Sequence, residues 1–114
     1  MLTSGDVVEL DLGVPEGREA GFRHAGIVVT AQRILDAQPN VIQVVPLTST
    51  IRGFAAEVVI EPDGDNGLRN QSAAQCQHIR AVSTGRVDRV IGNVGPSAVT
   101  QIRDTLGLIL DIPG

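Results

Sequence analysis

The chain has 114 residues, 42% of them hydrophobic, which predicts one globular domain over residues 1–114 and excludes an intrinsically disordered chain. Its formal net charge of −4 argues against tight, general binding of nucleic acid, although all nine basic residues are Arg, which pairs well with phosphate. Because it has a single Cys and no apolar run near the ~20 residues of a membrane span, we expect a cytoplasmic protein without an internal disulfide.

Short apolar segments typical of β-strands follow one another through most of the chain. In Asp6–Leu12, the residues Val8, Leu10 and Leu12 share one face, which predicts a half-buried strand. Gly13–Phe22 is rich in Gly and Pro and is expected to form a loop. Further strands are expected over residues 25–30, 41–47, 57–61, 72–82 (one or two strands) and 89–94, with a helical turn around 33–37.

The C-terminal end has the pattern of a helix. Pro96 suits the first turn of a helix, and Val99, Ile102 and Leu106 recur at helical spacing. We expect this helix to end at Asp111–Gly114. The whole pattern therefore predicts a mainly β protein of five to seven short strands with a C-terminal helix, typical of a small barrel or rolled sheet.

Three hydroxyl residues end the strand over 41–47: Thr48, Ser49 and Thr50, followed by Arg52. Hydroxyl groups and the planar fork of Arg suit an anionic ligand such as phosphate. The alternative is that these residues only open a turn, since Ser and Thr are common where strands stop. Pro46 within the strand predicts an edge, a bulge or a bend, because Pro cannot donate to the ladder.

Several short motifs occur in a characteristic order along the chain. They are Gly5-Asp6, Gly17-Arg18-Glu19, Ala20-Gly21-Phe22-Arg23, Val45-Pro46-Leu47-Thr48-Ser49 and Gln77-His78-Ile79-Arg80, before a helix containing Leu106-Gly107-Leu108. Over nearly the whole chain, this order resembles the MazF/PemK/Kid family of toxin–antitoxin ribonucleases. One departure is His24, which stands where the family usually has Pro.

The resemblance implies an SH3-like barrel that forms a homodimer, has a cognate antitoxin as partner and cleaves single-stranded RNA at specific sequences without a metal or cofactor. It implies Arg23, Thr48 and Glu19 as catalytic residues. The substrate contacts that we expect beside them are Ser49, Arg52, Arg18, Gln77, His78 and Arg80.

Metal-free RNA cleavage requires a group that stabilises the dianionic transition state and groups that move protons. Arg23 suits the first task as a fixed cation, and Glu19 is the natural candidate for the base. His24 and His78 could instead form an acid–base pair, since His titrates near neutral pH. The alternative is that His24 packs where Pro would, and that His78 only contacts substrate or points to solvent. No His or Cys spacing in the sequence favours a metal site.

Two other functions stay open at this point. A gyrase poison of the CcdB type shares the fold, but its activity is linked to a C-terminal tail that usually carries Trp, and this chain has no Trp. A catalytically inactive barrel that only binds protein would fit the acidic isoelectric point of about 4.9.

Overall fold

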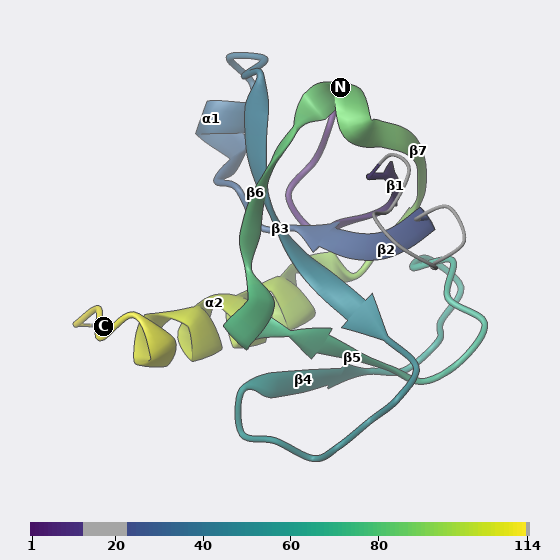
Figure 1. Cartoon of the computed structure of the whole chain (residues 1–114), viewed down its shortest axis with the longest axis vertical. Coiled ribbons are helices and arrows are strands. Elements are labelled where there is room, and N and C mark those ends of the chain that lie inside the picture. Colours follow the sequence, from purple (N-terminus) through teal and green to yellow (C-terminus); the bar gives the residue numbers. More distant parts are fainter. Residues whose placement is uncertain (13–22, 114) are drawn as a thin grey trace, which may run out of the picture.

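The computed structural model describes residues 1–12 and 23–113, with the backbone alone at Arg23 (Figure 1). Seven strands lie within these residues: β1 (Asp6–Asp11), β2 (Arg23–Val28), β3 (Val41–Thr48), β4 (Glu57–Ile60), β5 (Ser72–Gln75), β6 (Arg80–Ser83) and β7 (Val87–Asn93). The helix α1 (Gln32–Leu35) and the 3-10 turns η1 (Cys76–His78) and η2 (Thr84–Arg86) lie between strands, and the helix α2 (Gly95–Ile109) follows β7. The predicted mainly β fold with a C-terminal helix is confirmed.

The strands form one antiparallel sheet in the order β4-β5-β3-β2-β1-β7, and β6 also pairs with β3. Figure 1 shows this sheet curled, and α2 packs against β4 and η1. Strand β3 is the centre of the arrangement. It pairs with β2 along one edge, and along the other it pairs first with β6 and then with β5.

Two apolar clusters occupy the two faces of the curled sheet. Val7 and Ile27 belong to the cluster under α2, to which that helix contributes Ile102 and Leu106. Val8 and its neighbours belong to the second cluster, with Leu10, Val28, Leu35, Ile42, Val44 and Val82. Consecutive residues of β1 are thus both fully buried, so the prediction that β1 is half-buried holds only for its second half.

Two features of the helical segments agree with the sequence pattern. In α2, Pro96 lies in the first turn, and Val99, Ile102 and Leu106 are buried. Neither described helix is long and apolar enough to cross a membrane.

Cys76, in η1, is fully buried, and the loss of hydration raises the pKa of its thiol, as expected for a small apolar core residue.

Candidate functional site

A pocket of about 380 Å³ opens on the face of the sheet that carries the second apolar cluster. Strands β1, β2, β3, β5 and β6 and the turn η1 all meet at this pocket. Its described lining residues are Leu10, Leu12, His24, Ala25, Val44, Pro46, Gln75, His78 and Arg80. Every ionisable side chain among these lining residues is basic, in a chain whose net charge is −4.

The pocket lies where β3 changes partners. Strand β6 pairs with β3 as far as Val44, and β5 takes over at Leu47. Strand β3 continues through the intervening Pro46, which cannot donate to a ladder, and neither β6 nor β5 pairs with β3 at this residue. This gap in the pairing is a local strand edge, one of the alternatives predicted for Pro46. The turn η1 joins β5 to β6 beside this change of partner, and it therefore brings His78 to the pocket.

His24 reaches the pocket from β2, where it lies opposite Leu10 of β1. Two residues along the same face, Gly26 pairs with Pro46 of β3. A Cβ atom at Gly26 would lie only 2.3 Å from Val44 Cγ1, so β2 and β3 can approach this closely only because the residue is Gly. Because Gly26 has no side chain, Val44 forms the floor of the pocket.

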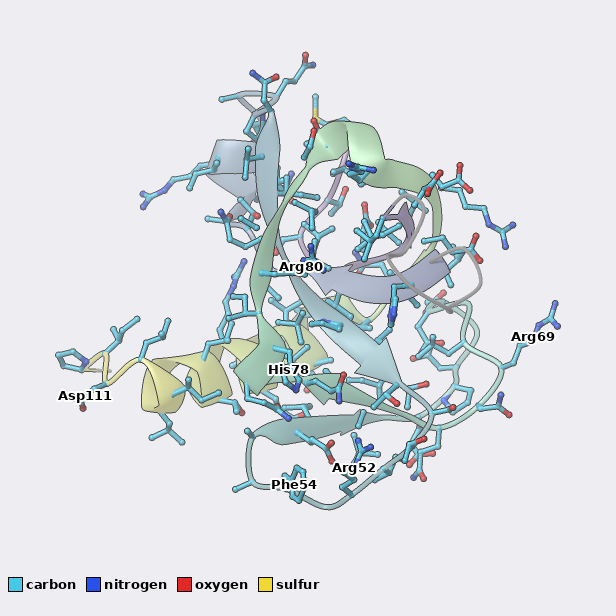
Figure 2. All side chains as sticks on the ribbon, viewed as in Figure 1. Arg52, Phe54, Arg69, His78, Arg80 and Asp111 are labelled. Atoms are coloured by element: carbon cyan, nitrogen blue, oxygen red, sulfur yellow. The ribbon has the colours of Figure 1, made fainter. Side chains whose placement is uncertain are left out.

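Consecutive residues of the η1–β6 junction face two different cavities. His78 and Arg80 line the basic pocket, and Figure 2 shows both along the front of the molecule. Ile79 between them lines a separate, mainly apolar groove of about 650 Å³ beside α2. Its lining includes Ile34, Ile79, Leu106, Leu108, Leu110 and Ile112.

The hydroxyl cluster at the end of β3 forms a turn. The backbone N–H of Thr50 donates to Thr48 Oγ1 at 3.1 Å, so this hydroxyl stabilises a turn, as one of the two interpretations of the sequence predicts. Thr48 is half-buried and Ser49 is exposed. Neither is among the described lining residues of the basic pocket.

The loop that follows Ser49 is held by Glu57, the first residue of β4. Glu57 Oε1 accepts hydrogen bonds from the backbone N–H groups of Arg52, at 3.2 Å, and Gly53, at 3.1 Å. Glu57 is half-buried, and these two bonds fix the path of the loop. Figure 2 shows Arg52 and Phe54 on this loop, on the far side of β4 from β5.

The structure therefore places the predicted site residues in three groups. His78 and Arg80 line the pocket, together with His24, which the sequence offered only as an alternative catalytic group. Thr48, Ser49, Arg52 and Gln77 are described but do not line it, whereas Gln75, which the sequence did not single out, does. Arg18 and Glu19 lie outside the described residues; the backbone of Arg23 pairs with Asp11, and its side chain is not described.

Within the described residues, no group of three or more His, Cys, Asp or Glu side chains is arranged to hold a metal ion. The chemistry available in the pocket is that of two imidazoles, a guanidinium and an amide against an apolar floor. Such a site can bind an anion and exchange protons with it.

A model of the PemK-like, MazF-like toxins of type II toxin–antitoxin systems matches residues 3–110. The chain belongs to this family. It is 31% identical to the protein named endoribonuclease MazF9 of Mycobacterium tuberculosis (strain ATCC 25618 / H37Rv) over 116 residues, which cover 98% of each chain. The resemblance read from the sequence is thereby confirmed.

Solved structures of toxins have the same fold. The MazE–MazF complex (Form-II) of Deinococcus radiodurans contains a chain that matches with a TM-score of 0.79 and 22% identity, covering 96% of each chain. A mycobacterial endoribonuclease in complex with its cognate antitoxin matches with a TM-score of 0.77 and 20% identity, covering 100% of this chain and 99% of that one. These likenesses confirm the SH3-like barrel of the MazF type.

Proposed function

We propose that this toxin is an endoribonuclease that cleaves single-stranded RNA at specific sequences without a metal ion. The observation that carries the proposal is the pocket where β3 changes its partner from β6 to β5, whose ionisable lining among the described residues is wholly basic. A basic pocket in an acidic protein favours a local contact with an anionic substrate over general binding of nucleic acid. The name endoribonuclease MazF9, given to a relative that matches almost end to end, supports this activity.

The proposed reaction uses the ribose 2′-hydroxyl as an internal nucleophile on the adjacent phosphate. The protein then needs to hold that phosphate and stabilise a crowded, doubly charged transition state. Arg80 and His78, which line the pocket, are proposed to contact the phosphate. By family resemblance, Arg23 stabilises the transition state and Thr48 binds a non-bridging oxygen, while Glu19 is the resemblance's candidate for the base.

The distribution of charge favours one side of the molecule for the RNA. We propose that the strand passes over Arg80 and the loop with Ser49 and Arg52, with Gln77 beside it and Arg18 on the segment outside the described residues. The exposed carboxylates of Glu61, Asp63 and Asp65 lie instead on the β4–β5 connection, where they would repel phosphate.

We propose that a cognate antitoxin neutralises the toxin by covering the same pocket, and that the toxin acts in the cytoplasm as a single domain, 1–114. Support for an antitoxin comes from the family and from the solved complexes of similar toxins with theirs. An acidic segment of the antitoxin would suit the basic pocket and would compete directly with RNA.

We also propose that the toxin is a homodimer, joined through the apolar groove beside α2. Several aliphatic side chains stand out from the surface here: Leu108 is 84% exposed, Leu110 57% and Ile112 59%. A contiguous apolar surface of this kind is unusual on a monomer and typical of an interface. Because Ile79 lies between His78 and Arg80, a second copy seated in this groove would also support the wall of the basic pocket.

The test is incubation of the purified chain with a long single-stranded RNA, with and without EDTA. The proposal predicts defined fragments in both reactions. Cleavage that EDTA abolishes and Mg²⁺ restores would contradict the metal-independent mechanism. Intact RNA in both reactions would contradict the ribonuclease function itself and favour a toxin that acts only by binding protein.

A further inference from the structure

The chain contains two His residues, and both line the same pocket. They come from different elements: His24 from β2 and His78 from η1. Both side chains are exposed, so both can meet a substrate and exchange protons with water. Arg80 lines the pocket with them and can hold an anion there by charge-assisted hydrogen bonds.

His is the side chain whose ordinary pKa lies closest to neutral, so a pair of His residues can supply one base and one acid at the same pH. An Arg cannot take either part readily, because its guanidinium stays protonated. The pocket thus brings together the two functions that metal-free RNA cleavage requires: a fixed cation for the phosphate and two groups for proton transfer.

The titratable groups around this pair are few among the described residues. Strand β1 carries Asp6, Glu9 and Asp11, β2 carries Arg23, and η1 carries the buried Cys76. Strands β3 and β5 carry none. Glu9 accepts two hydrogen bonds from Arg89 of β7, at 2.9 and 3.0 Å. Arg80, of β6, is the charged group that lines the pocket with the two His residues.

We propose that His24 and His78 together supply the general base and the general acid of RNA cleavage, one residue in each role. The role of base is the one that family resemblance assigns to Glu19. The inference rests on the proposed ribonuclease function. The neutral His takes the proton from the 2′-hydroxyl as its oxygen attacks phosphorus. The bond from phosphorus to the 5′-oxygen breaks, and the protonated His gives its proton to that oxygen. The products are a 2′,3′-cyclic phosphate and a 5′-hydroxyl, and exchange with water restores both His residues.

The experiment compares rates of cleavage across pH 5 to 9 for the wild type, His24→Gln and His78→Gln. Arg86→Gln, on η2 away from the pocket, is the control for loss of a positive charge. Gln keeps a polar amide in place of the imidazole but cannot carry the proton. Each variant is checked for its melting temperature, and the His positions are exposed, so we expect folded proteins.

The wild type should give a bell-shaped profile, and each His variant should lose at least about 100-fold in rate and one limb of the bell. Arg86→Gln should keep both limbs. A substrate with sulfur in place of the 5′-bridging oxygen needs no acid, because a thiolate leaves readily. That substrate should restore cleavage by the variant that lacks the acid and not by the variant that lacks the base, which assigns the two roles.

Three results would overturn the pair while leaving the ribonuclease function intact. The first is a flat pH profile for the wild type. The second is a pair of His variants whose cleavage rates stay within about threefold of the wild-type rate. The third is a pair of His variants that are slow but keep both limbs of the bell and are not rescued by the sulfur substrate. The last result would mean that the His residues only bind substrate. Failure of the wild type to cut any RNA would instead overturn the proposed function.

Discussion

Val44 of β3 and Arg80 of β6 are paired across the sheet, and both line the candidate pocket. The first prediction follows from this pairing, because it fixes the Arg80 backbone beside the pocket floor. Lys at this position keeps the charge but loses the planar fork, and a charge-assisted hydrogen bond is worth about 1.5–3 kcal/mol. We expect Arg80→Lys to lower kcat/KM for RNA about tenfold or more with an unchanged melting temperature. Equal activity of Arg80→Lys and the exposed control Arg86→Lys would remove Arg80 from the substrate contacts.

The second prediction concerns Arg23, to which family resemblance assigns stabilisation of the transition state. Removal of one preorganised donor typically costs about 10²–10³ in rate. Arg23→Lys should therefore lower the cleavage rate at least about tenfold without changing thermal stability. Thr48→Val should have a milder effect, and Thr48→Ser, which keeps the hydroxyl, serves as its control. A wild-type rate for Arg23→Lys would show that this residue is only a solvated charge.

The third prediction tests the homodimer. Leu108 lines the apolar groove and is largely exposed in the single chain, so its replacement by Asp should not disturb folding. In the dimer, the same change would bury an unpaired carboxylate, which is strongly unfavourable. Sedimentation should show a dimer for the wild type and a monomer for Leu108→Asp at micromolar concentration. Val90→Asp, at an exposed site outside this groove, should stay dimeric. A wild type that sediments as a monomer would contradict the proposal.

The fourth prediction concerns the close approach of β2 and β3. Ala at Gly26 would place its Cβ within 2.3 Å of Val44 Cγ1, and overpacking of this kind costs about 1–3 kcal/mol. Unfolding in urea should show a loss of this size for Gly26→Ala. Gly64→Ala is the matched control: its Cβ would meet nothing within 4 Å, so its stability should stay within about 0.5 kcal/mol of wild type. Equal urea midpoints for Gly26→Ala and Gly64→Ala would mean that β2 and β3 can move apart without loss of stability.

The strands and the terminal helix could be predicted because their signal is local. Apolar periodicity in β1 and α2 depends only on neighbours in the chain, and the buried stripe of α2 follows it. Burial on both faces of a strand is less visible. Val7 packs under α2 and Val8 packs on the opposite face, and only the complete sheet determines this.

The pocket could be predicted only in part, because distant pairings and one short turn assemble it. Strict alternation from Gln75 would put Gln77 and Ile79 on the same side. The 3-10 turn η1 changes that phase, so Gln75, His78 and Arg80 line one pocket instead. Similarly, the role of Glu57 has no local signal in the sequence, because its bonds to the N–H groups of Arg52 and Gly53 arise from the path of the loop.

The central claim is that this toxin cleaves RNA through the ribose 2′-hydroxyl, and one substrate tests it directly. Once the cleavage site in a long RNA has been mapped, a short oligonucleotide is made with deoxyribose only at the nucleotide on the 5′ side of the scissile phosphate. The all-ribose oligonucleotide should be cut in EDTA and leave a 2′,3′-cyclic phosphate. The substituted one should stay intact, because it lacks the nucleophile. Cleavage of the substituted oligonucleotide at the same bond would contradict the account.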